Sequence, residues 1–188
     1  MQLASQQVLS VSRQHAWDAL NNVDILQRSI PGCSSLVEMA PQHYEILITA
    51  AVGPVKAKFK GKLSLSDLNP PQSYRIDFEG QGGAAGHGKG SATVRLEPTS
   101  AQRCVLFYEA TASVGGKIAQ IGQRLVDMAA QKMASEFFNN FEAQLATTYP
   151  TEDEKPVTTV APDASVWTRL WRWVHRVFAG KAAETKDA

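Results

Sequence analysis

The sequence predicts an α+β fold, in which an antiparallel sheet is flanked by helices. Apolar and polar residues alternate with a period of two through much of residues 55–114, which is typical of strands with one buried face. Turn residues separate these segments at short spacing, and this favours hairpins because parallel strands need long crossovers. A long segment with helical periodicity then follows. With 188 residues, of which 44% are hydrophobic, the chain has room for one core of ordinary size.

The predicted strands form a meander, and the clearest of them covers residues 55–65. Its apolar side chains point to one face of the sheet and its lysines point to the other. The lysines are Lys56, Lys58, Lys60 and Lys62. We expect a solvated face here, with docking to an acidic partner or to anionic lipid as the alternative. Further alternating segments cover residues 74–79, 92–97 and 104–114.

The glycine-rich run at residues 80–90 is predicted to be a hairpin tip, either at the mouth of a cavity or simply on the surface. The run partly matches the glycine patterns of nucleotide-binding loops. A dinucleotide site needs a helix after its glycines, and a phosphate loop needs Ser or Thr directly after its lysine. Here Gly90 follows Lys89 and the next residues alternate like a strand, so we expect no nucleotide site.

Helices are predicted on both sides of the meander. Ser12 is suited to cap a helix at 13–20, and a second short helix at 23–30 would end at Pro31-Gly32. After Gly115-Gly116 a long helix is predicted from 117 to 147. Its main apolar stripe consists of Val126, Ala129, Ala130, Met133, Phe137 and Phe141. The first half carries a second stripe, which indicates a cavity wall, a partner surface or deep burial: Ile118, Ile121, Leu125 and Met128.

Composition and motifs argue against several classes of function. The net charge of +1 disfavours a dedicated nucleic-acid-binding protein. Cys33 and Cys104 are far apart and lack C-x-x-C spacing, so neither a structural zinc site nor a disulfide is expected. We predict no metal site and no catalytic residues, although His87 in the glycine run would be the first histidine to test as an acid or base. The chain starts without a signal-peptide pattern, which predicts a cytoplasmic location.

The C-terminal region differs from the rest in composition. Residues 1–147 are predicted to form the folded domain, 148–165 a linker rich in Pro, Thr, Glu and Asp, and 180–188 a polar tail. Between these, residues 166–179 predict an amphipathic helix that is too short to span the ~30 Å core of a bilayer. One face is apolar and rich in tryptophan: Val166, Trp167, Leu170, Trp171, Trp173, Val174, Val177 and Phe178. The opposite face carries the basic residues Arg169, Arg172 and Arg176.

This pattern favours a helix that lies on a membrane surface. Tryptophan prefers the headgroup region of a bilayer, and arginine attracts anionic lipid. A helix of this length is marginal in water, so we expect it to become ordered on contact with the membrane. The alternatives are a contact with a partner protein or packing on the chain's own domain.

Five runs of sequence carry a resemblance to a known family. They are A-W-D-A-L-N-N-V-D-I-L at 16–26, I-P-G-C at 30–33, V-G-P-V-K-A-K-F-K-G-K at 52–62, G-Q-G-G-A-A-G-H-G-K-G-S-A at 80–92 and V-G-G-K-I-A-Q-I-G-Q-R-L-V-D at 114–127. Together with E-F-F at 136–138, these residues resemble the CoxG family of carbon-monoxide-dehydrogenase subunits, which belongs to the START/polyketide-cyclase superfamily. The resemblance covers residues 1 to 147, and the tail after 148 is similar to the membrane-binding extension of some members.

The resemblance implies a helix-grip fold, with a curved antiparallel sheet of about seven strands around the long C-terminal helix and an apolar cavity between them. It also implies a non-catalytic accessory protein of an aerobic molybdenum hydroxylase of the CO dehydrogenase type. Such a protein would recruit the enzyme to the inner face of the cytoplasmic membrane and handle a lipid-soluble, prenylated quinone, without a tightly bound cofactor. The alternatives are a membrane anchor without a ligand, or a cyclase-like or hydrolase-like enzyme on the same fold.

Candidate residues for the cavity wall follow from the predicted faces of the strands and of the long helix, and from no family motif. The expected ligand-binding residues are Phe59, Leu63, Tyr74, Phe78, Leu125 and Met128.

Overall fold

The computed structural model describes residues 1–150. Beyond the first few residues of the predicted linker, the C-terminal region lies outside the described residues, and with it the predicted membrane-binding helix at 166–179. The elements in chain order are β1 (Gln2–Leu9), α1 (Arg13–Leu20), α2 (Val23–Ser29), β2 (Cys33–Ala40), β3 (His43–Val52), β4 (Val55–Asn69), β5 (Ser73–Gln81), β6 (His87–Ser100), β7 (Arg103–Gly115), α3 (Lys117–Gln120) and α4 (Gln123–Thr148).

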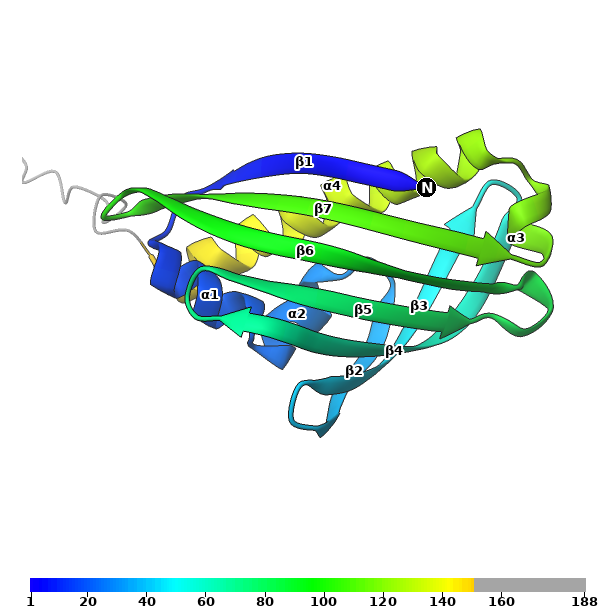
Figure 1. The fold of residues 1–188 in the computed structure, drawn as a ribbon, viewed down its shortest axis with the longest axis horizontal. Coiled ribbons are helices and arrows are strands. Elements are labelled where there is room, and N and C mark those ends of the chain that lie inside the picture. The colour runs from blue at the N-terminus through cyan, green and yellow to red at the C-terminus, as the bar shows by residue number, and fades with distance from the viewer. Residues whose placement is uncertain (151–188) are drawn as a thin grey trace, which may run out of the picture. The chain divides into compact units, whose positions relative to one another are not determined.

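The strands form one antiparallel sheet in the order β1-β7-β6-β5-β4-β3-β2. Strands β2 to β7 are a meander of hairpins. Strand β1 pairs with β7 and forms the edge of the sheet opposite β2. Helix α4 runs behind the sheet in Figure 1, against its inner face. This arrangement confirms the predicted fold class, a seven-stranded antiparallel sheet with a long C-terminal helix.

The two short helices form where their capping residues predict them. The Ser12 Oγ accepts a hydrogen bond from the His15 backbone N–H at 3.2 Å, which satisfies an otherwise free donor in the first turn of α1. The Asn22 Oδ1 does the same for the first turn of α2. Helix α2 is held to α4 by Asn140, whose Nδ2 donates to the Ser29 backbone oxygen at 3.1 Å.

The long helix begins later than predicted. The expected single helix at 117–147 is interrupted at Gly122, whose φ of +94° lies in the left-handed region. Glycine adopts such a conformation at little cost, and it is a poor residue for a helix interior. The structure therefore has a four-residue helix, α3, followed by a change of direction and then α4.

The glycine-rich run forms the tip of the β5–β6 hairpin, as predicted: residues 82–86 connect the strands, and the rest of the run belongs to the ends of β5 and β6. Strand β6 stands where a nucleotide-binding loop would have a helix. The tip turns through a short 3₁₀ segment at Gly83–Ala85, and the Ala85 side chain is buried. A side chain on Gly116 would place its Cβ 2.6 Å from the Cα of Gly86. Only glycine fits this approach, so the hairpin tip is fastened to the end of β7.

The hydrophobic core lies at one end of the space between sheet and helices. It includes Trp17 and Leu20 of α1, and Phe141 and Leu145 from the C-terminal half of α4. Phe141 is completely buried. In the N-terminal half of α4, by contrast, Met133 and Ala134 face the sheet and are only half-buried. The interior is therefore closely packed at the α1 end and hollow further along.

Candidate functional site

The hollow part of the domain is an apolar cavity between the inner face of the sheet and α4. It consists of two adjoining parts, a wide lobe of about 430 Å³ and a narrow lobe of about 300 Å³. The two lobes share the wall residues Ile46, Leu63, Phe78 and Met133.

Small residues on both walls create the cavity. In the register of the sheet, Gly61 on β4 lies opposite Gly80 on β5, which lies opposite Gly88 on β6. Three neighbouring strands therefore present a row without side chains on the inner face, and this row lines the narrow lobe. The facing wall contributed by α4 leaves further space, because three of its lining residues are alanines: Ala129, Ala130 and Ala134. Larger residues at these positions would fill the space, as they do in an ordinary core.

The wall of the wide lobe is apolar apart from three phenol groups. Its lining includes no charged side chain among the described residues. The only side-chain polar atoms on it are the hydroxyls of Tyr44, Tyr74 and Tyr108. The narrow lobe is mostly apolar as well. Among the described residues, its ionisable lining residues are Glu79, His87 and Lys89, on the ends of β5 and β6 next to the glycine hairpin, and Met1, which carries the N-terminal amino group. Such a lining is suited to a hydrophobic ligand with few polar groups.

Four of the six predicted wall residues lie at the cavity. Leu63 and Phe78 line both lobes, Phe59 lines the narrow lobe, and Tyr74 lines the wide lobe. Their alternation along β4 and β5 places them on the inner face, where α4 crosses the sheet.

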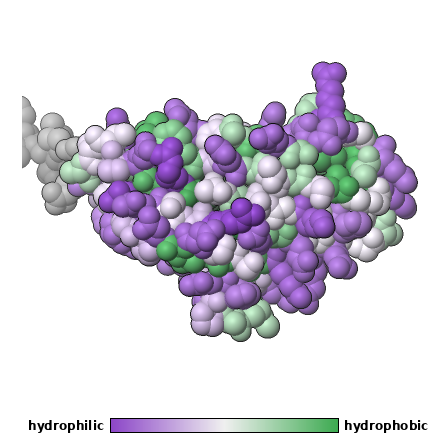
Figure 2. All heavy atoms as spheres, in the orientation of Figure 1, coloured by the Kyte–Doolittle hydropathy of each residue, from purple (hydrophilic) through white to green (hydrophobic). Residues whose placement is uncertain are grey.

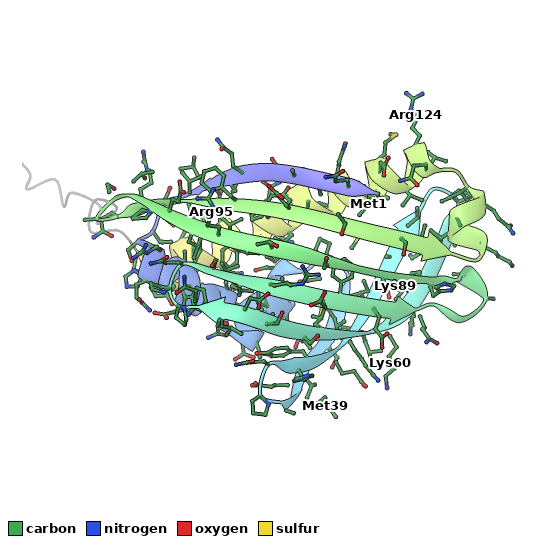
Figure 3. All side chains as sticks on the ribbon, in the orientation of Figure 1. Met1, Met39, Lys60, Lys89, Arg95 and Arg124 are labelled. Atoms are coloured by element: carbon green, nitrogen blue, oxygen red, sulfur yellow. The ribbon has the colours of Figure 1, made fainter. Side chains whose placement is uncertain are left out.

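The prediction was wrong for Leu125 and Met128, which are 41% and 56% exposed and are absent from the wall of either lobe. The stripe that faces the sheet runs through Val126 and Met133, and successive helical residues point about 100° apart. Leu125 therefore points about 100° away from this stripe, and Met128 points to nearly the opposite side of the helix. Near them Arg124 points away from the sheet (Figure 3), and the Leu125 Cδ1 lies 3.6 Å from the position a Gly53 Cβ would take.

Sequence reasoning missed the aromatic part of the α4 wall and two of the tyrosines. Phe137 and Phe138 line the wide lobe, where the Phe138 ring packs on Tyr108 with a centroid distance of 5.2 Å. Tyr108 shares the inner face of β7 with Leu106 and Ala110, so the alternation within that strand was sufficient to predict its place on the wall. The row of glycines needed the register between strands, which alternation within one strand does not reveal.

Tyr74 is the most deeply placed polar residue of the wall, with 5% of its side chain exposed. Its ring meets Trp17 edge to face at a centroid distance of 5.5 Å. Burial raises the pKa of the Tyr74 hydroxyl well above its usual value, and the nearby Tyr44 adds to this. The phenol therefore stays protonated, and available as a hydrogen-bond donor, throughout the physiological range.

The outer face of the sheet is largely hydrophilic (Figure 2). Acidic and basic residues alternate across it from strand to strand. Glu45, Lys62, Glu79 and Lys89 lie opposite one another on successive strands from β3 to β6. In the predicted lysine stripe, Lys60 forms an ion pair with Glu45 at 2.9 Å. Figure 3 labels Lys60 and Lys89 on this face.

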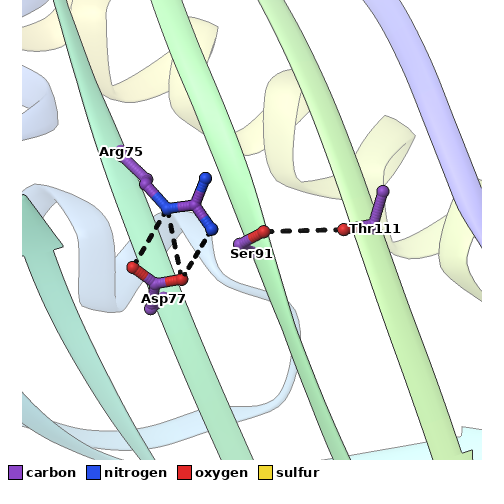
Figure 4. A network of polar contacts seen from close by, with 4 residues as sticks. All are labelled: Arg75, Asp77, Ser91 and Thr111. Atoms are coloured by element: carbon purple, nitrogen blue, oxygen red, sulfur yellow. Dashed lines mark hydrogen bonds and ion pairs between the residues drawn. The ribbon is translucent and has the colours of Figure 1, made fainter.

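Next to this row, the Arg75 guanidinium pairs with Asp77, and the hydroxyls of Ser91 and Thr111 lie 3.5 Å apart (Figure 4). Each of these polar side chains therefore has a partner on the same strand or the neighbouring strand, on an exposed surface. Such an arrangement is typical of a solvated sheet face.

Groups suited to bond-breaking chemistry are not gathered in the part of the chain that the structure describes. No cluster of three or more His, Cys, Asp or Glu side chains within residues 1–150 could hold a metal ion. His87 stands at the rim of the narrow lobe with its ring against Gly115, and no side-chain hydrogen bond ties it to another described residue. Across the same residues, no helix combines the length and apolarity that crossing a bilayer requires.

The fold and its apolar cavity define a helix-grip protein of the START type. The domain is similar to a START superfamily protein from Mycobacterium smegmatis, with a TM-score of 0.61 and 10% identity over 78% of this chain and 98% of that one. It is also similar to the Zhui aromatase/cyclase from Streptomyces sp. R1128, with a TM-score of 0.56 and 11% identity over 78% and 95% of the two chains. At such low identity these likenesses show the fold alone.

A nearer likeness is to a conserved protein from Geobacillus kaustophilus, with a TM-score of 0.75 and 28% identity over 79% of this chain and 97% of that one. The model of the CoxG family of carbon monoxide dehydrogenase subunits matches residues 6–146. The chain belongs to this family, as the sequence resemblance predicted. No curated protein matches the chain.

Proposed function

We propose that this protein is a non-catalytic accessory protein that holds a membrane quinone in its cavity and couples a molybdenum hydroxylase of the CO dehydrogenase type to the cytoplasmic membrane. The observation that carries the proposal is the apolar two-lobed cavity, found in a chain of the CoxG family.

The cavity has the dimensions of a ligand site. The wide lobe alone, at about 430 Å³, falls within the range of roughly 300–1,000 Å³ that is usual for small-molecule sites. An empty apolar cavity of this size leaves its wall atoms without contacts, and a hydrophobic ligand restores them. A prenylated quinone combines a flat ring with a branched hydrocarbon tail, and the wide and narrow lobes offer a place for each.

The cavity wall favours a carrier over an enzyme. The fold also occurs in an aromatase/cyclase, so the fold by itself does not decide the function. General acid–base catalysis needs a group that gains or loses a proton near neutral pH. The wide lobe presents only phenols, and burial raises the pKa of the deepest of them further from neutrality. His87 lies at the rim of the narrow lobe, and no side-chain hydrogen bond to another described residue orients it for such a role.

Attachment to the membrane is assigned to the apolar, tryptophan-rich face predicted for residues 166–179, which lie outside the described part of the chain. A helix of this kind would hold the domain where quinones dissolve. The hydroxylase would then deliver its electrons to a quinone next to the bilayer.

Lipid extraction of the purified protein tests the ligand. We expect mass spectrometry to detect a prenylated quinone in the wild type and to find it lost from Ala134→Phe, which places a ring in the wide lobe next to α4. The matched control is Ala143→Phe on the exposed side of the same helix, which should retain the quinone. If no quinone or other lipid co-purifies with the wild type and none binds on addition, the carrier function is wrong.

A further inference from the structure

The wide lobe combines an apolar wall with one buried hydroxyl that has no hydrogen-bond partner within residues 1–150. Tyr74 makes no side-chain hydrogen bond to another residue of the described chain, and Val94 and Ile76 beside it offer none. A buried phenol oxygen usually finds a partner, because leaving it without one costs free energy. The missing partner within the described chain therefore suggests that the hydroxyl serves to bind a ligand.

The Tyr74 oxygen is also open to the cavity. Within residues 1–150, no side-chain oxygen or nitrogen is both closed off completely and without a hydrogen-bond partner. Since the Tyr74 hydroxyl lacks a partner, it must keep some free surface. The residue is 95% shielded from bulk solvent and lines the wide lobe, so this surface faces the lobe.

The other two phenols of the lobe are placed differently. Of the three, Tyr74 alone is buried. Tyr44, on the inner face of β3 opposite Leu63, is only partly buried. Tyr108 is half-exposed, and its ring is held by Phe138. A hydrogen bond from Tyr74 to a ligand would thus be the one most protected from competition by water.

We propose that the Tyr74 hydroxyl donates a hydrogen bond to an oxygen atom of the bound lipid, and that the cavity selects uncharged lipids with a carbonyl or similar acceptor oxygen at one end. This inference rests on the proposed ligand-binding function and assigns the polar anchor of that site. It also sets the orientation of the ligand, with its oxygen in the wide lobe and its hydrocarbon in the narrow lobe.

The lining explains why the ligand is uncharged. A carboxylate or phosphate moved from water into the wide lobe would lose its hydration and would meet no lysine, arginine or histidine on the lobe's wall. A carbonyl oxygen loses far less hydration free energy than a charged group when it enters the lobe, and one hydrogen-bond donor is enough to satisfy it. Fatty acids and phospholipids are therefore disfavoured as ligands with their charged groups in the wide lobe.

The orientation follows from the position of Tyr74 on β5. Gly80 lies on the same face of the same strand, about 20 Å further along at the usual rise per residue. The hydroxyl thus stands near the packed core, where the Tyr74 ring meets Trp17, and the row of glycines stands toward the α3 end. A ligand anchored by its oxygen at Tyr74 extends its hydrocarbon along this row.

Binding measurements on the full chain, stripped of lipid, test the inference with phylloquinone, the hydrocarbon phytane and the carboxylate phytanate. We expect Tyr74→Phe to weaken phylloquinone binding roughly three- to tenfold and to leave phytane within about twofold. The matched control Tyr108→Phe, which also removes a hydroxyl from the wide lobe, should leave both ligands within about twofold. Phytanate should bind more weakly than phylloquinone to every variant.

Infrared spectroscopy of phylloquinone labelled at its carbonyl groups supplies a second readout. A hydrogen bond lowers the carbonyl stretching frequency, so the bound wild type should show a lowered band that Tyr74→Phe returns to its position in an apolar solvent. If Tyr74 had only a structural role, Tyr74→Phe would weaken phytane binding as well, and the carbonyl band of bound phylloquinone would not shift.

The two proposals fail in different ways. If neither phylloquinone nor phytane binds the wild type, the proposed ligand-carrying function is wrong. If both bind but Tyr74→Phe changes neither the preference for phylloquinone nor the carbonyl band, only the anchoring role of Tyr74 is overturned. Tighter binding of phytanate than of phylloquinone would overturn the selection of uncharged lipids.

Discussion

Gly86 and Gly116 show how single residues hold the α3 end of the domain together. Gly86 has a φ of +119°, and a Cβ at this position would lie 2.0 Å from the Gly115 backbone oxygen. Both the backbone conformation and the space therefore require glycine. The contact joins the β5–β6 tip to the segment that leads into α3, and so it helps to close the narrow lobe, where Ile118 of α3 is part of the wall.

We predict that Gly86→Ala destabilises the protein by roughly 1–3 kcal/mol or more, because the strained backbone adds to the displacement of β7. Chemical denaturation monitored by circular dichroism measures this change. The matched control is Gly83→Ala in the same tip, where φ is +57° but nothing lies within 4 Å, so only the backbone cost of about 1 kcal/mol applies. Equal destabilisation by the two substitutions would contradict the close approach of the hairpin tip to β7.

At the scale of the elements, the strands were the most predictable part of the fold. Alternation in residues 55–65 predicted the inner face of β4, because a strand with one buried face has a period of two whatever lies around it. The N-cap residue Ser12 predicted the start of α1 for a similar reason, since its hydrogen bond is local.

The errors concern what local patterns do not contain. The stripe through Leu125 and Met128 is as periodic as the one through Val126 and Met133, and only the sheet decides which of them faces inward. The interruption at Gly122 was missed because a single glycine costs a helix only about 1 kcal/mol, which tertiary contacts often override. The cavity wall was predicted in part, while its glycine row depends on pairing between strands.

A separate prediction concerns membrane binding by the C-terminal segment at 166–179. We expect the double substitution Trp171→Glu with Trp173→Glu to abolish flotation of the full chain with vesicles that contain anionic lipid, because two charges then stand on the apolar face. The control Thr168→Gln with His175→Gln alters only the polar face and should float like the wild type. Equal flotation of a chain truncated after residue 148 would show that this segment is not the attachment.

At the scale of the whole molecule, stability and occupancy should be linked. The core that joins α1, the sheet and the end of α4 is complete without a ligand, whereas the N-terminal half of α4 faces the cavity. A ligand that binds only the folded state stabilises it by mass action. The empty domain should therefore fold by itself and become more stable when the cavity is filled.

We predict that phylloquinone raises the melting temperature of the lipid-free protein. At a free concentration about 100 times the dissociation constant, the gain is roughly 2.7 kcal/mol, which corresponds to roughly 5–10 °C for a domain of this size. Differential scanning calorimetry measures the shift, and Ala134→Phe should show little or none of it. An unchanged melting temperature in the wild type at saturating quinone would contradict a ligand site in the interior.

The row formed by Gly61, Gly80 and Gly88 has a consequence for the selectivity of the proposed ligand site. Where a wall has no side chains, a guest touches main-chain atoms, and these are the same whatever the neighbouring sequence. Such a surface responds to the cross-section of a hydrocarbon chain, to which methyl branches contribute, and offers no side chain that would recognise other details of the chain. Recognition of the proposed ligand is therefore left to the far end of the molecule, at Tyr74.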